Sequence, residues 1–232
     1  MVALDVADLA IAEQLARRLA GAVGFFKVGL ELFSRYGPLA VERIGWHGQV
    51  FLDLKLHDIP ATVGRSARQL GPLRVAMLSV HASGGPAMVK AAVEGLAEGG
   101  VDPGARSLVV AVTVLTSLED GDLATLGLPA APEQAPRLAR VAIGAGAAGV
   151  VCAPRHLSAV RAEVGSEPVV VTPGVRPASV SRDDHAHAAT PEEAVAGGAD
   201  FIVVGRPVTA ADDPVKAARS ILAAVGSRAG GT

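Results

Sequence analysis

Three charged side chains lie close together in one apolar segment, "FLDLKLHDIP" at 51–60. If this segment is a strand, Phe51, Asp53 and Lys55 share one face and the intervening leucines share the other. Neighbouring carboxylates favour the protonated form of an amine, because they stabilise its positive charge. Lys55 is therefore expected to be a proton donor rather than the neutral amine that an imine requires.

Further charges occur in two earlier apolar segments. Asp5 lies in "VALDV" (2–6) and Lys27 lies in "FFKVG" (25–29). If these strands neighbour the strand of Asp53 and Lys55, side chains of alternating sign meet at one place, and each offsets the cost of burying the next. A structural ion-pair network is the alternative. Hydrophobic side chains of similar size usually serve stability as well or better, which favours a functional site.

Two glycine–arginine motifs occur near the end of the chain, "TPGVRP" (172–177) and "VVGRPVT" (203–209). Glycine lets a ligand approach the backbone, and arginine can donate two hydrogen bonds to phosphate oxygens. Arg176, Gly205 and Arg206 therefore predict a phosphate site. The polar segment 176–190 follows the first motif, and a loop of this length is expected to be a mobile lid over the phosphate.

The elements that must position these residues are short segments rich in valine, isoleucine and leucine, with helix-like segments between them. They predict eight strands, at 2–6, 25–29, 50–55, 77–82, 107–115, 149–153, 168–175 and 201–207. Eight alternating strands and helices favour a single-domain (β/α)8 TIM barrel over 1–232, whose active site lies at the carboxyl ends of the strands. An open doubly wound sheet is the alternative, but no G-x-G-x-x-G follows the first strand.

Two helices carry clear sequence signals. Thr190, Pro191 and Glu193 combine a capping box with a proline at the first helical position, and 213–226 is predicted to be a closing amphipathic helix. Residues 227–232 are expected to be a frayed tail.

The composition indicates which binding partners and which cellular compartment to expect. A net charge of −2 gives no reason to expect nucleic acid, and no apolar run reaches the roughly 20 residues that span a membrane. With one cysteine and no basic leader, the chain is expected to be cytoplasmic. Cys152 is expected to be a packed core thiol and His57 a structural residue. His81 could either support the site by hydrogen bonding or act in it directly.

The segments "LDLKLHDIP", "VHASGG", "LTS", "TPGVRP" and "GRPVT" together resemble orotidine 5′-phosphate decarboxylases, in the same order and over nearly the whole chain. The resemblance implies decarboxylation of orotidine 5′-monophosphate to UMP in de novo pyrimidine biosynthesis. It implies a homodimer that uses neither a metal nor an organic cofactor.

The resemblance also implies roles for individual residues. Lys55 would protonate C6 of the pyrimidine, with Asp53 beside the scissile carboxylate, while Asp58 and Thr62 would reach the neighbouring subunit's site. The remaining substrate-binding residues would contact the ribose (Asp5 and Lys27), the pyrimidine edge (Thr116 and Ser117), and the lid and phosphate (Arg176, Gly205 and Arg206).

Two positions depart from the family pattern. Ala61 stands where an asparagine is usual, and His185 stands where a lid glutamine bridges phosphate and pyrimidine. Histidine can still donate to phosphate, so we expect weaker or more pH-dependent binding. Two alternatives remain open: a Mg²⁺-dependent sugar-phosphate decarboxylase or aldolase of the same superfamily, which a chelator would inhibit, and a non-catalytic UMP-binding barrel.

Overall fold

The computed structural model describes residues 1–101, 107–177 and 189–226. The greater part of the predicted lid, His185 included, and the predicted tail at 227–232 lie outside these residues.

In the described part of the chain, eight parallel strands form one sheet in the order of the sequence. The strands are β1 (Val2–Ala3), β2 (Phe25–Gly29), β3 (Gln49–Leu56), β4 (Met77–His81), β5 (Leu108–Val112), β6 (Gly149–Val151), β7 (Val169–Thr172) and β8 (Phe201–Ile202). Val204, just after β8, pairs with Val2 of β1. The predicted (β/α)8 barrel is confirmed, and the doubly wound alternative is wrong because the strand order never reverses.

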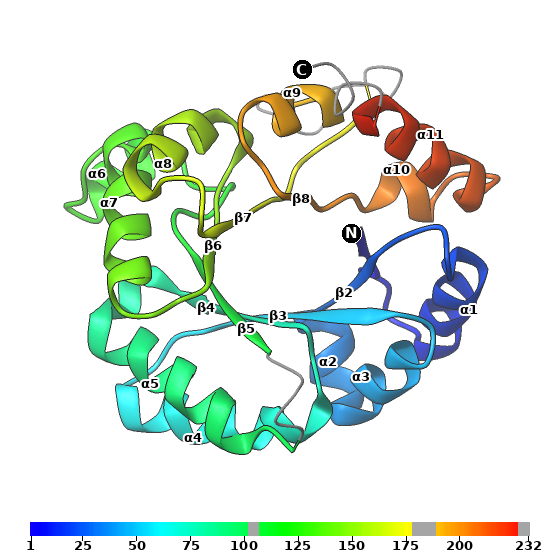
Figure 1. The fold of residues 1–232 in the computed structure, drawn as a ribbon, viewed down its shortest axis with the longest axis horizontal. Helices are drawn as coiled ribbons and strands as arrows, with labels where there is room; N and C mark the ends of the chain where they lie inside the picture. Colours follow the sequence, from blue (N-terminus) through cyan, green and yellow to red (C-terminus); the bar gives the residue numbers. More distant parts are fainter. Residues whose placement is uncertain (102–106, 178–188, 227–232) are drawn as a thin grey trace.

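The helices form a ring outside the strands, as Figure 1 shows. Their bounds are α1 (Leu9–Leu19), α2 (Leu30–Tyr36), α3 (Pro38–Gly45), α4 (Pro60–Leu70), α5 (Gly85–Gly99), α6 (Asp120–Thr125), α7 (Ala131–Gly144), α8 (Leu157–Val164), α9 (Pro191–Ala196), α10 (Arg206–Thr209) and α11 (Pro214–Gly226). Short 3-10 helices lie at η1 (Gly71–Leu73), η2 (Ala82–Gly84) and η3 (Pro154–His156).

The alternation along the strands divides the buried side chains into two cores. Phe51 and Met77 belong to a small cluster inside the barrel, whereas Leu52 and Leu54 belong to the larger cluster between strands and helices. The predicted division of β3 into a leucine face and a charged face is confirmed. Because the inner cluster occupies the middle of the barrel, polar side chains at the strand ends face a cavity rather than the core.

The two predicted helices begin as the sequence indicates. The Thr190 hydroxyl accepts the Glu193 N–H at 3.2 Å, and the Glu193 carboxylate accepts the Thr190 N–H at 2.8 Å. This capping box opens α9, directly after the segment that contains the predicted lid. The helix predicted over 213–226 is α11.

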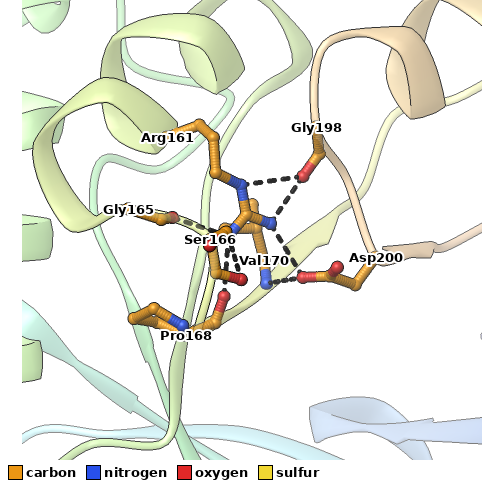
Figure 2. Close-up of polar contacts among 7 residues, drawn as sticks. All are labelled: Arg161, Gly165, Ser166, Pro168, Val170, Gly198 and Asp200. Carbon is orange, nitrogen blue, oxygen red and sulfur yellow. Dashed lines mark hydrogen bonds and ion pairs between the residues drawn. The ribbon is translucent and has the colours of Figure 1, made fainter.

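The side chain of Arg161 joins the amino-terminal ends of β7 and β8, at the end of the barrel opposite the carboxyl ends of the strands. Figure 2 shows the Arg161 guanidinium of α8 donating to the backbone oxygens of Gly165, Ser166, Pro168 and Gly198. It also lies 2.8 Å from Asp200, whose carboxylate accepts the Val170 N–H. One side chain therefore connects three segments of the polypeptide. It does so at the amino-terminal face of the barrel, where residues usually contribute to stability rather than to catalysis.

Helices α4 and α5 approach each other backbone to backbone. A Cβ atom added at Gly95 would lie 2.1 Å from the carbonyl oxygen of Gly64, so only glycine fits there. This contact holds α4, whose first turn carries Thr62, close against α5. Within the ranges described, the structure has no helix with the length and apolar character of a membrane span.

Candidate active site

A cavity of about 250 Å³ opens at the carboxyl ends of the strands. Apolar residues of the inner core form its floor, among them Phe51 and Val112. The structure brings six of the predicted site residues to its lining: Asp5, Lys27, Asp53, Lys55, Thr116 and Gly205.

The four charged residues of this lining form one continuous series of ion pairs, hereafter the charged chain: Asp5, Lys27, Asp53 and Lys55. Lys27 Nζ lies 2.9 Å from Asp5 Oδ1 and 3.6 Å from Asp53 Oδ2. Lys55 Nζ lies 2.7 Å from the same Asp53 oxygen. Positive and negative side chains alternate along this series, so each charge lies beside an opposite one. This is the arrangement that was expected where the first three strands end.

Asp53 is at the centre of this chain and is 8% exposed. Burial raises the pKa of its carboxyl group, but the charges of Lys27 and Lys55 and the hydrogen bonds from Lys55 and Ser79 outweigh burial. The pKa of Asp53 therefore lies below its usual value, and the carboxylate is charged at neutral pH.

The backbone of Lys55 is left-handed, with φ at 52°. An L-residue in this conformation costs about 1–2 kcal/mol relative to the right-handed one. The strand register changes at the same place, because Leu52 pairs with Leu78 whereas Leu56 pairs with Val80. Strain of this kind gathers at functional sites, where the surrounding structure holds it in place.

The two residues predicted to serve a neighbouring subunit lie outside the lining of this cavity. Asp58 is exposed, and its carboxylate accepts the N–H of Ile59 at 2.6 Å. Thr62 lies on the first turn of α4. Within a single chain, therefore, neither side chain contacts the charged residues of the cavity, and Ser117 is an exposed neighbour of Thr116 beyond its rim.

The predicted phosphate residues lie beside the cavity, after β7 and β8. Gly205 lines it, and Arg206 begins α10 directly afterwards. The N–H of Arg176 donates to the carbonyl oxygen of Ala189 at 2.9 Å, so the two described ends of the predicted lid pair with each other.

Three further residues singled out in the sequence are Cys152, His57 and His81. Cys152 is buried, and burial raises the pKa of its thiol to about 12, which favours a packed core thiol. The rings of His57 and His81 lie 5.2 Å apart. Burial, and then the charges of His57 and Lys55, lower the pKa of His81.

Two residues that contact the charged chain were not predicted. Ser79 of β4 donates to Asp53 Oδ1 at 2.7 Å. Gly29, which ends β2, leaves room for the Asp5–Lys27 pair. The serine inside the apolar segment "MLSVHA" was the available signal for the first. Among the residues that the structure describes, no three His, Cys, Asp or Glu side chains gather as a metal site would require.

Comparison with known proteins finds orotidine 5′-phosphate decarboxylases both by sequence and by structure. The chain is 55% identical over 223 residues to the orotidine 5′-phosphate decarboxylase of Anaeromyxobacter sp. (strain K), covering 95% of each. It is 48% identical to that of Thermobifida fusca (strain YX), covering 96% of this chain and 93% of the relative. The crystal structure of orotidine 5′-phosphate decarboxylase from Lactobacillus acidophilus superposes with a TM-score of 0.84, at 36% identity and 97% coverage of both chains.

The sequence profile of the orotidine 5′-phosphate decarboxylase / HUMPS family matches residues 1–221. This range includes every strand of the barrel and every described residue of the charged cavity. The chain therefore belongs to the orotidine 5′-phosphate decarboxylase family.

Proposed function

We propose that this protein converts orotidine 5′-monophosphate to UMP in pyrimidine biosynthesis, with Lys55 as the proton donor and no cofactor. The observation that carries the proposal is the chain of alternating charges at the cavity, which ends in the Lys55 ammonium group 2.7 Å from Asp53. The single cysteine suits a reducing compartment, so we expect the enzyme in the cytoplasm.

The reaction breaks the bond between C6 of the pyrimidine and the carboxylate carbon. CO2 leaves, and the bonding electron pair stays on C6 in an orbital in the plane of the ring, where the π system cannot delocalise it. The Lys55 ammonium stabilises this pair and then donates a proton to C6, which yields UMP. Lys55 is left as a neutral amine and regains a proton from water.

Asp53 has two tasks in this mechanism. Its charge lies opposite the Lys55 ammonium and offsets the cost of placing that charge in the cavity. Its oxygen also fixes the direction of the Lys55 side chain at 2.7 Å, so that the proton is aimed before the substrate arrives. Lys27 and Asp5, continuing the same chain, would bind the ribose hydroxyls, and Thr116 with Ser117 the pyrimidine edge.

The phosphate would be held by Arg176, Gly205 and Arg206. A lid over 176–190, carrying His185, would close over it, and binding energy from this remote group would help to position the pyrimidine ring. We propose that these parts belong to one barrel domain over 1–232, with 227–232 as a tail.

The deciding experiment follows the absorbance of orotidine 5′-monophosphate after addition of purified protein in the presence of EDTA. We expect rapid loss of substrate absorbance that is unchanged by the chelator. No loss of absorbance, even with Mg²⁺ restored, would direct the assay to the substrates of the sugar-phosphate enzymes of the superfamily, which use a metal. Binding of UMP without any turnover would favour a non-catalytic nucleotide-binding barrel.

Gly29 offers a test of the ribose assignment. An alanine Cβ there would lie 3.0 Å from Asp5 Oδ1 and 3.1 Å from Lys27 Nζ, so Gly29→Ala should displace that pair. The backbone is compatible with alanine, since φ is −96°. We expect a KM about tenfold higher because the ribose contacts are misplaced.

Gly121→Ala is the matched control, since a Cβ at Gly121 meets nothing within 4 Å. Steady-state kinetics and thermal melts of both variants supply the comparison. An unchanged KM in Gly29→Ala would argue against ribose binding by Asp5 and Lys27.

We propose that the functional unit is a homodimer in which Asp58 and Thr62 complete the neighbouring subunit's site. The exposure of Asp58, just beyond the strand that carries Lys55, supports this arrangement. Mixing inactive Lys55→Ala and Asp58→Ala subunits should then restore activity at about a quarter of the sites, because half of the random dimers contain one complete site.

The control for subunit mixing pairs Lys55→Ala with the double variant Lys55→Ala/Asp58→Ala, which can form no complete site. Activity is measured after both proteins have been allowed to exchange subunits. A Lys55→Ala and Asp58→Ala mixture no more active than this control would refute the shared site.

A further inference from the structure

We infer that Ser79 is a positioning residue for the proton donor: its single hydroxyl holds both the backbone of Lys55 and the carboxylate of Asp53 in the geometry that aims the ammonium group. The inference rests on the proposed function and adds a residue that the motifs do not mark.

The hydroxyl of Ser79 makes two hydrogen bonds, and both go to the charged chain. It accepts the backbone N–H of Lys55 at 2.8 Å and donates to Asp53 Oδ1 at 2.7 Å. The residue is 0% exposed, so no bulk water competes for either bond. Both bonds reach from β4 to β3, so Ser79 fixes the two residues from a strand other than their own.

The strand pairing explains why a side chain is needed here. Between the pairs Leu52–Leu78 and Leu56–Val80, three residues of β3 lie opposite the single residue Ser79 of β4. The ladder is interrupted over this stretch, and the left-handed Lys55 directs its N–H to the Ser79 hydroxyl instead of to a β4 carbonyl. A buried N–H without an acceptor is costly, so the hydroxyl stabilises the unusual conformation.

The same hydroxyl fixes the orientation of the Asp53 carboxylate. Ser79 bonds to Oδ1, whereas Lys55 lies 2.7 Å and Lys27 3.6 Å from Oδ2. With both oxygens held, the plane of the carboxylate cannot rotate, and the Lys55 ammonium has one defined partner atom. Alanine at position 79 would keep the apolar packing of β4 but would free both the carboxylate and the Lys55 backbone.

Ser79→Ala is therefore expected to lower kcat on the order of 100-fold, the effect of a misplaced reacting group. Affinity for UMP should change by less than about threefold, because no assigned binding group is removed. Thr113→Val is the matched control: Thr113 is also buried, and its hydroxyl donates to the Val151 oxygen at 3.0 Å, away from the charged chain. In Thr113→Val, the Val151 oxygen still accepts the backbone N–H of residue 113, so no buried acceptor is left without a donor. This control should therefore retain the wild-type kcat.

A second measurement is independent of activity. Amide hydrogen exchange at Lys55, followed by NMR on the ligand-free protein, should quicken roughly five- to tenfold in Ser79→Ala because the N–H loses its acceptor. Thr113→Val should leave that rate unchanged.

The two readouts separate this inference from the proposed function. Absence of turnover in the wild-type protein would refute the decarboxylase assignment, and amide exchange would still test the contact between Ser79 and Lys55. Wild-type turnover with an unaltered kcat in Ser79→Ala would overturn the inference alone. An equal loss of kcat and UMP affinity, or an unaltered exchange rate at Lys55, would overturn it as well.

Discussion

Lys55→Met should lower the kcat for orotidine 5′-monophosphate by about 10³-fold or more, because it removes the proton donor and the charge that stabilises the C6 electron pair. Methionine has a similar length, so the cavity keeps its shape while Asp53 loses its nearest charged partner. Lys27 remains 3.6 Å from Asp53 and continues to offset its charge. The variant should therefore fold and bind UMP, which isothermal calorimetry would measure beside the kinetics.

The control for this prediction is Lys90→Met. Lys90 lies on α5 with its side chain 67% exposed, and its ion pair with Glu94 has an N–O distance of 3.8 Å. An exposed pair of this kind contributes little to stability, so Lys90→Met should behave as the wild type in both assays. A Lys55→Met protein that retained a tenth of the wild-type kcat would exclude Lys55 as the essential donor.

Arg161→Met should destabilise the fold by about 2–3 kcal/mol, since it removes a charged donor shared by several carbonyl oxygens and one carboxylate. These acceptors surround the guanidinium in Figure 2, and they lie just after α8 and just before β7 and β8. For a chain of this length, the melting temperature should fall by roughly 4–12 °C. Calorimetry at a fixed protein concentration would measure the change.

The comparison variant for Arg161 is Arg140→Met. Arg140 of α7 pairs with Glu163 of α8 at 3.0 Å, but its side chain is 67% exposed. Solvent screens such a pair, so its removal should change the free energy of unfolding by less than about 1 kcal/mol. Equal melting temperatures for the two variants would mean that the Arg161 contacts contribute no more than a surface ion pair.

The positions of the strands could be predicted from the sequence, whereas the lengths of the first and last could not. Apolar segments separated by helix signals locate all the strands, because each must be buried between the barrel interior and a helix. The first and last were predicted over 2–6 and 201–207, but as continuous strands they extend only over Val2–Ala3 and Phe201–Ile202. Asp5 and Gly205, which lie beyond those points, line the cavity, and no composition signal marks where strand pairing stops.

The charged part of the site could be predicted because strand alternation and strand order bring Asp53, Lys55 and Lys27 to one end of a barrel. The left-handed backbone of Lys55 could not, since it depends on a register change between two strands. The contacts of Ser79 with Lys55 and Asp53 could not be predicted for the same reason. A serine in a buried strand has no evident partner until the neighbouring strand is placed beside it.

The barrel closes through a narrow seam between the two ends of the chain. Val204 pairs with Val2 through two backbone hydrogen bonds, from the Ala3 N–H and to the Met1 carbonyl. The residues joined are about 200 positions apart, so closing this ring carries a large loop entropy. We expect the seam to form late in folding and to be the first part of the sheet to open.

Two of the proposed substrate contacts lie directly on that seam. Asp5 lies shortly after the paired residues of β1, and Gly205 directly follows Val204. A Cβ atom added at Gly205 would lie 3.8 Å from the Cβ of Ala3. A nucleotide that bonds to both sides would link the ends of the chain and favour the closed ring by mass action. The protein should then resist proteolysis longer when UMP is added than in its absence.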